Sequence, residues 1–242
     1  MPRFFLSTID ASVSTAYIEG DDAKHITKVL HAKLGQEFVL SDARGTDYLC
    51  AVRKLDTAIV TLDILSSQPC QGETEATIRL YQALPKGDKL EFIIQKAVEL
   101  GVSEITPVLT SRCISRPSHK AMDKKLERLQ RIAYEAAKQC GRGIIPRVMP
   151  LLEIDRALVQ MAGSEMPILL YEESRQPLSK VLRPNLGSVS IMVGSEGGFS
   201  QGEVDFATNQ GVVCASLGRR ILRCETAPIA ALSVILCHLG EL

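Results

Sequence analysis

The sequence lacks the features that mark secreted, membrane-inserted or metal-binding proteins. Its seven cysteines include no C-x-x-C pair and none at zinc-site spacing from the four histidines, so we expect neither a disulfide framework nor a bound metal. The longest apolar run, residues 227–239, is too short to span a bilayer, and the N-terminal apolar run is shorter than a signal-peptide core. We therefore expect a cytoplasmic protein with no membrane segment.

The chain also has no net charge and no familiar catalytic signature. Lys plus Arg and Asp plus Glu number 28 each, so only local charge can indicate a polyanionic partner. No P-loop, nucleophile elbow or metal-binding helix occurs. What is present is the balance of a folded protein, with 45% hydrophobic and 23% charged residues in 242. That length suits one ordinary domain and one small domain.

Residues 1–72 are predicted to form a small β-domain. Short runs rich in β-formers occupy residues 37–40, 48–53 and 58–65, with a turn at 42–45 and a helix expected at 21–30. The stretch 66–72 is polar and rich in helix and strand breakers, so the boundary is placed at its end.

Residues 73–242 are predicted to form an α/β domain, because strand and helix patterns alternate from residue 77 onward. Such alternation is typical of a mostly parallel sheet with helices on both faces. Strands are expected at 78–84, 104–109, 167–171, 189–193 and 212–217. Helices are expected at 90–100, 122–140, 151–161, 201–209 and 228–239.

A glycine-rich turn at residues 193–200 is the first candidate for chemistry. Ser200 and Glu203 have the spacing of a capping box, so a helix should begin there. Glycines let the backbone approach a ligand closely at the carboxyl end of a strand, where α/β sheets bind small molecules. The pattern is not G-x-G-x-x-G, and Glu196 would repel a pyrophosphate, which disfavours a dinucleotide. A purely structural tight turn is the alternative.

The second candidate is the loop at residues 216–226, and the third is a basic segment at 112–147. The loop contains three arginines and a glutamate among apolar residues. Such a loop either lines a binding site or is a basic loop exposed to solvent. Thr226 is available as the N-cap of the last helix. The basic segment holds ten Lys and Arg against three Asp and Glu. So many positive charges in one segment can neutralise several phosphates. Part of the segment, however, is the solvent-exposed face of an amphipathic helix.

Several sequence blocks resemble one family. Gly194-x-Glu196-Gly197-Gly198 and Leu217-Gly218-x-Arg220-Ile221-Leu222-Arg223-x-Glu225-Thr226-Ala227 are similar to the two C-terminal signatures of the RsmE family of methyltransferases, in the SPOUT superfamily. Upstream blocks, such as Gln95-Lys96-x-x-Glu99-Leu100-Gly101 and Glu135-x-x-x-Gln139-x-Gly141-Arg142, extend the similarity over nearly the whole chain. The chain departs from the pattern at His31, Ser195, Arg219 and Cys224.

The resemblance implies a PUA-like RNA-binding β-barrel followed by a SPOUT domain with a deep trefoil knot. It implies a homodimer that uses S-adenosylmethionine to methylate N3 of a uridine in 16S ribosomal RNA, near the decoding site of the small subunit. The residues that it assigns to the cofactor are Leu170, Gly194, Glu196, Gly197, Gly198, Leu217, Gly218, Ile221, Leu222 and Thr226. The residues expected to contact RNA are Arg112, Lys124, Arg128, Arg142 and Arg220.

Arg223 and Glu225 are the catalytic candidates. Uracil N3 carries a weakly acidic proton, which a carboxylate can accept while a guanidinium stabilises the negative charge on the flanking oxygens. The alternative is that the two residues form an ion pair that holds the loop.

Two rival functions remain for the whole protein. One is a non-catalytic RNA-binding or ribosome-assembly protein on the same scaffold. The other is a related knotted methyltransferase that acts on transfer RNA.

Overall fold

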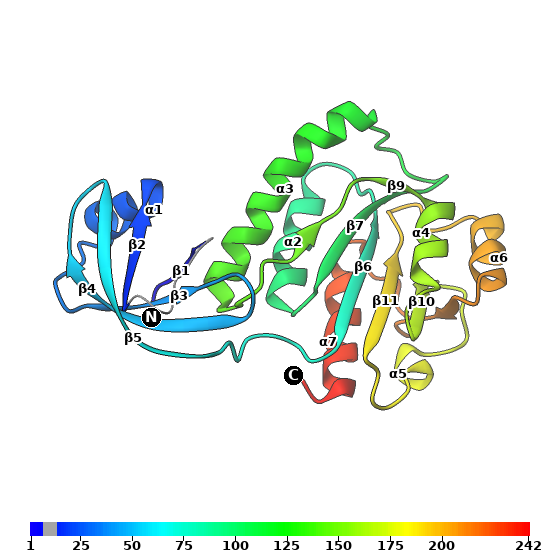
Figure 1. Cartoon of the computed structure of the whole chain (residues 1–242). Helices are drawn as coiled ribbons and strands as arrows, with labels where there is room; N and C mark the ends of the chain where they lie inside the picture. Colours follow the sequence, from blue (N-terminus) through cyan, green and yellow to red (C-terminus); the bar gives the residue numbers. More distant parts are fainter. Residues whose placement is uncertain (7–13) are drawn as a thin grey trace. The chain divides into compact units, whose positions relative to one another are not determined.

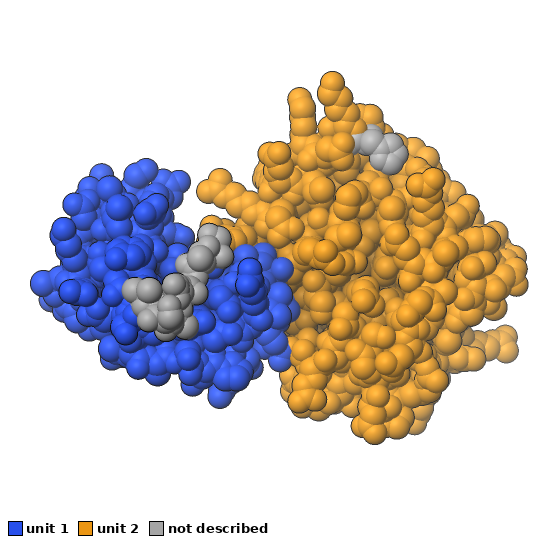
Figure 2. All heavy atoms as spheres, in the orientation of Figure 1, with its two compact units in different colours: residues 1–73, 137–145 blue, residues 74–136, 146–242 orange. Residues whose placement is uncertain are grey.

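The computed structural model describes residues 1–6 and 14–242, which divide into two compact units (Figure 2). Unit 1 contains residues 1–73 and 137–145, and unit 2 contains residues 74–136 and 146–242. The sequence placed a single boundary after residue 72. In the structure, residues 137–145 also belong to the N-terminal unit. They join it through long-range contacts, which no local sequence pattern shows.

Unit 1 is built on a five-stranded sheet in the order β1-β3-β4-β5-β2, in which only the β1–β3 pair is parallel. The buried rings of Phe4 and Phe38 meet edge to face at the centre of its core, with centroids 5.7 Å apart. The expected helix at 21–30 is present as an α-helix followed by a π-helix. The elements are β1 (Arg3–Phe5), β2 (Thr15–Glu19), α1 (Gly20–Lys24), η1 (His25–Val29), β3 (Glu37–Ser41), β4 (Thr46–Lys54) and β5 (Ile59–Pro69).

Glu73 attaches residues 142–144 to this unit. Its Oε2 lies 2.6 Å from Nη2 of Arg142, whose side chain is only 4% exposed. Its Oε1 accepts hydrogen bonds from the backbone N–H groups of Gly143 (2.8 Å) and Ile144 (2.9 Å). Burial and this ion pair give Arg142 a structural role in unit 1, which corrects the expectation that it contacts RNA.

We predict that Arg142→Met destabilises unit 1 by roughly 3 kcal/mol, because a buried ion pair that loses one partner leaves an uncompensated charge. Hydrogen exchange of the β4 and β5 amides measures the opening of this unit. Arg53→Met is the matched control, since the Arg53–Asp63 pair lies in the same sheet but is largely exposed and should be worth less than about 1 kcal/mol. Equal effects of the two substitutions would refute the structural role of Arg142.

Unit 2 is built on a parallel sheet in the order β12-β10-β11-β6-β7-β8, with β9 also paired to β7 (Figure 1). Consecutive residues such as Leu80 and Tyr81 are both buried although they point to opposite faces, so both faces are covered. The strands are β6 (Thr77–Ala83), β7 (Glu104–Leu109), β8 (Arg147–Val148), β9 (Leu152–Glu153), β10 (Met166–Leu170), β11 (Ser188–Val193) and β12 (Val213–Ala215).

The helices of unit 2 form two groups: α7 contacts α2 and α5, and α4 contacts α6. The α/β class and the parallel sheet are thereby confirmed, whereas the knotted chain path stays a prediction. None of the helices within 1–6 and 14–242 has the length and apolarity needed to cross a membrane. The helices are α2 (Lys89–Glu99), α3 (His119–Cys140, whose last four residues belong to unit 1), α4 (Ile154–Met161), α5 (Leu178–Val181), α6 (Gln201–Asn209) and α7 (Thr226–Leu239).

Candidate active site

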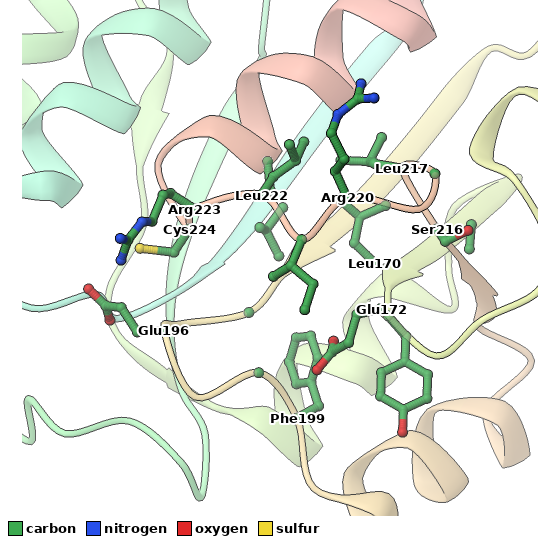
Figure 3. Close-up of a pocket in the computed structure, with 18 of the residues that line it drawn as sticks. Leu170, Glu172, Glu196, Phe199, Ser216, Leu217, Arg220, Leu222, Arg223 and Cys224 are labelled. Atoms are coloured by element: carbon green, nitrogen blue, oxygen red, sulfur yellow. The ribbon is translucent and has the colours of Figure 1, made fainter.

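A cavity of about 510 Å³ lies at the carboxyl ends of β10, β11 and β12. These strands are neighbours in the sheet, so the segments that follow them meet at one edge, where open α/β sheets bind ligands. Lining residues come from 170–172, 193–199 and 215–227 (Figure 3). Leu170, Phe199, Leu217 and Leu222 supply apolar walls, and Glu172, Glu196, Arg220 and Arg223 supply charges.

The glycine-rich turn forms one wall. Gly198 has φ of +63° and donates its N–H to the carbonyl of Ser195 at 3.0 Å, which closes the turn. The predicted capping box is confirmed, since Ser200 and Glu203 exchange side-chain and backbone hydrogen bonds at the start of α6. Gly194 is tightly enclosed, because an added Cβ would lie 3.2 Å from Gly198 Cα and from the Phe199 ring, which would have to shift slightly. The turn is therefore compact as well as exposed to the cavity.

Eight of the ten residues expected at the cofactor line this cavity: Leu170, Gly194, Glu196, Gly198, Leu217, Gly218, Ile221 and Leu222. Gly197 and Thr226 are not among the lining residues. A Cβ on Gly197 would approach Arg112, at 2.9 Å from its Cβ and 3.0 Å from its carbonyl oxygen, so that position packs on the loop after β7. Thr226 begins α7, with Glu225 as the N-cap residue and no side-chain cap.

The two catalytic candidates have different environments. Arg223 lines the cavity, and Figure 3 shows it on the same side as Glu196 and Cys224. Glu225 is not a lining residue; its Oε2 lies 3.1 Å from Nζ of Lys89. The expected alternative, an ion pair between Arg223 and Glu225, is absent among the described residues, because Lys89 takes the place of the arginine.

Hydrogen bonds keep the neighbouring carboxylates ionised. The Cys224 thiol, the backbone N–H of Glu225 itself and the Lys89 ammonium lower the pKa of the Glu225 carboxyl. Partial burial opposes ionisation of Glu196, but hydrogen bonds from Lys89 and from the Lys86 backbone outweigh it and lower the pKa of that carboxyl. Burial raises the pKa of the Cys224 thiol to about 12, so this cysteine is a thiol at neutral pH.

The expected RNA-contacting residues other than Arg142 are exposed. Lys124 and Arg128 lie on α3, and the Arg128 guanidinium pairs with Glu91 at 2.8 Å. Arg112 Nη1 donates to the carbonyl of Gly197 at 3.1 Å, which links it to the glycine turn. Arg220 lines the cavity itself, so it belongs to the same site as the cofactor candidates.

Some lining residues were not predicted, among them Tyr171, Glu172, Phe199 and Ser216. Tyr171 and Glu172 lie at the end of an expected strand and just after it, Ser216 lies near the end of another, and Phe199 sits in the glycine turn. The strand-end rule could therefore have identified them. Lys89 had no such signal, because its carboxylate partners are more than one hundred residues away in the sequence. Together, these features define an α/β domain with a nucleotide-sized cavity at the carboxyl edge of a parallel sheet, joined to a small β-unit.

Comparisons with known proteins agree with that class. Residues 72–236 match the RNA methyltransferase domain family, and residues 18–65 match the RNA methyltransferase PUA domain family. The chain is 33% identical to the ribosomal RNA small subunit methyltransferase E of Bacillus subtilis, over 97% of this chain and 96% of the relative.

Solved structures show the same similarity. The ribosomal RNA small subunit methyltransferase E of Neisseria gonorrhoeae, bound to S-adenosyl methionine, is 31% identical with a TM-score of 0.90, covering 99% of this chain and 98% of that one. A putative methyltransferase of Legionella pneumophila in complex with the same cofactor is 28% identical with a TM-score of 0.83, covering 97% and 96%. The chain belongs to the RNA methyltransferase family that includes the ribosomal RNA small subunit methyltransferase E proteins.

Proposed function

We propose that this protein transfers the methyl group of S-adenosylmethionine to N3 of a uridine in 16S ribosomal RNA, near the decoding site of the small subunit. The observation that carries the proposal is the cavity at the ends of β10, β11 and β12, which gathers eight residues expected to bind the cofactor. The similarity to a relative that is bound to S-adenosyl methionine supports the same cofactor.

The cavity suits this cofactor in size and chemistry. Its volume of about 510 Å³ lies within the usual range for small-molecule sites, roughly 300–1,000 Å³. Leu170, Leu217 and Leu222 offer apolar contacts for an adenine ring, and backbone groups of the loops can pair with its polar edge. When bound, the cofactor supplies a methyl group carried on a positively charged sulfur.

Arg223 is proposed to act on the RNA base. Release of the N3 proton to solvent spreads negative charge onto the two flanking uracil oxygens, and a guanidinium in a partly enclosed site stabilises that charge. Glu225 is proposed to act through Lys89 and its loop, because its carboxylate is engaged by Lys89 and Cys224 and its lowered pKa makes it a weak proton acceptor.

The proposed substrate is folded ribosomal RNA rather than a short oligonucleotide. A paired uridine presents its Watson–Crick edge to its partner, so N3 becomes accessible only when the base is unpaired or flipped. The PUA-like unit and the exposed Arg112, Lys124 and Arg128 provide contacts beyond one nucleotide. We expect RNA within an assembled small subunit to be preferred.

A homodimer is part of the proposal. Helix α7 buries Pro228, Ala231, Leu232, Ile235 and Leu236, while Ile229 and Val234 are only partly covered within the chain. A helix that is apolar on most of its surface usually packs on both sides, so a second copy is the proposed partner. Light scattering that shows a fully active monomer would exclude it.

The central experiment supplies S-adenosylmethionine with a labelled methyl group to small subunits taken from a strain that lacks this protein. We expect one labelled nucleoside, 3-methyluridine, from 16S RNA, and slower labelling of short RNA fragments. Mass spectrometry of the digested RNA identifies the product. Absence of cofactor binding with retained RNA binding would favour a non-catalytic assembly protein, and label in transfer RNA would favour the other rival.

A further inference from the structure

Lys89 connects two loops of the cavity. This residue begins α2, and its Nζ lies 3.0 Å from Glu196 Oε1 in the glycine turn and 3.1 Å from Glu225 Oε2 at the start of α7. Nζ also lies 3.7 Å from the Cys224 sulfur, and the Cys224 thiol donates to Glu225 at 3.1 Å. One ammonium group thus holds carboxylates from both the loop after β11 and the loop after β12.

The Lys89 ammonium and the two carboxylates carry opposite charges and are partly shielded from solvent. The side chains of Lys89, Glu196 and Glu225 are 32%, 25% and 28% exposed. The two carboxylates raise the pKa of Lys89, and Lys89 in turn lowers theirs, so all three are ionised at neutral pH. Because Lys89 lies on a helix packed against the sheet domain, the two loops share one anchor on a rigid element.

We propose that Lys89 is a positioning residue of the methyl-transfer site: it ties the two loops together and engages the carboxylates that would otherwise attract Arg223. This inference rests on the proposed function. Figure 3 shows Arg223 beside Glu196, yet none of the ion pairs in the described part of the chain includes Arg223. With both carboxylates held by Lys89, the Arg223 guanidinium remains available to the substrate.

Removal of the ammonium group has two consequences. The loops lose their common anchor, so the cavity walls move independently. Glu196 and Glu225 also lose their shared cation, so Arg223, which lies beside Glu196 in Figure 3, is drawn towards the unpaired carboxylates. The first consequence weakens cofactor binding, and the second lowers the rate of methyl transfer.

The first test uses the protein without cofactor or RNA. Lys89→Met keeps most of the side-chain length, Lys89→Arg restores a cation, and Lys96→Met is the control because Lys96 pairs with Glu99 on its own helix. We expect Lys89→Met to speed amide hydrogen exchange in both loops, residues 194–200 and 216–225, with Lys89→Arg restoring most of the protection. If the amide exchange rates of either loop were the same in Lys89→Met as in the wild type, the proposal that Lys89 links the two loops would be overturned.

The second test measures S-adenosylmethionine affinity by titration calorimetry and methyl transfer to small subunits. Loss of two ion pairs should weaken affinity roughly tenfold in Lys89→Met, with a further fall in kcat, a normal KM for the small subunit and partial rescue by arginine. Wild-type values for affinity and kcat in Lys89→Met would overturn the inference. A wild-type protein that binds no S-adenosylmethionine would instead refute the proposed function, which the exchange experiment does not depend on.

The two ion pairs of Lys89 also predict how protection of the loops against hydrogen exchange depends on pH. Because the pKa values of Glu196 and Glu225 are lowered, the two pairs persist as pH falls below the ordinary glutamate range and are lost only as it passes through the lowered values. In the wild type, loop protection should therefore fall as pH passes through the lowered pKa values, whereas in Lys89→Met, which lacks both pairs, protection should already be low and should not change over that pH range. Identical pH profiles would contradict the assigned contacts.

Discussion

Arg223→Ala should reduce kcat for methyl transfer by about 100-fold to 1,000-fold while S-adenosylmethionine affinity changes little. Removal of a single group that stabilises a developing oxyanion typically costs this much. Arg223 lines the cavity, and none of the ion pairs in the described ranges engages it. Its charge is therefore available for uracil oxygens. Steady-state labelling of small subunits measures kcat, and calorimetry measures cofactor affinity.

Two further variants make that result specific. Arg156→Ala removes an exposed arginine on α4, outside the cavity, and should leave both quantities unchanged. Arg223→Lys keeps the charge but loses the planar, bidentate geometry, so it should recover only part of the rate. If Arg223→Ala instead weakened cofactor binding as much as it lowered kcat, Arg223 would be a cofactor contact and another group would have to stabilise the anion.

Elements with strong local signals were predictable from the sequence. The bounds of α6 (Gln201–Asn209) agree with the expected helix, because a capping box marks its start and Gly211 lies just after its end. The bounds of β7 (Glu104–Leu109) also agree. Short elements such as β8 and α5 were missed, since two to four residues carry too little periodicity to be recognised.

The site was predictable where its residues follow strands in the sequence. The glycine turn and the loop after β12 come directly after strands of the parallel sheet, so the strand-end rule and the family resemblance located both. Arg142 was misassigned because its charge was visible but its partner, Glu73, is 69 residues away. Lys89 was missed for the same reason, because long-range ion pairs leave no periodic trace in one sequence.

The second large effect concerns Gly198, where an added side chain would disturb the cavity wall itself, whereas a side chain at the neighbouring Gly197 would press on Arg112. Gly198 lines the cavity and has a left-handed backbone with φ of +63°. A left-handed conformation costs an L-residue roughly 1–2 kcal/mol, and a β-branched side chain is a genuine outlier there. A Cβ would also lie 2.9 Å from the Glu172 carboxylate, so that flexible side chain must move within the cavity.

We therefore expect Gly198→Val to weaken S-adenosylmethionine binding by at least about 30-fold, because relief of the backbone strain opens the turn that Gly198 N–H and Ser195 C=O close. Calorimetry measures the affinity, and circular dichroism checks that the fold persists. Gly202→Val is the matched control: Gly202 lies two residues into α6, with no atom within 4 Å of an added Cβ and no positive φ. Wild-type affinity in a folded Gly198→Val protein would show that the closed turn is not needed for the cofactor, and a comparable loss in Gly202→Val would assign the effect to α6 rather than to the turn.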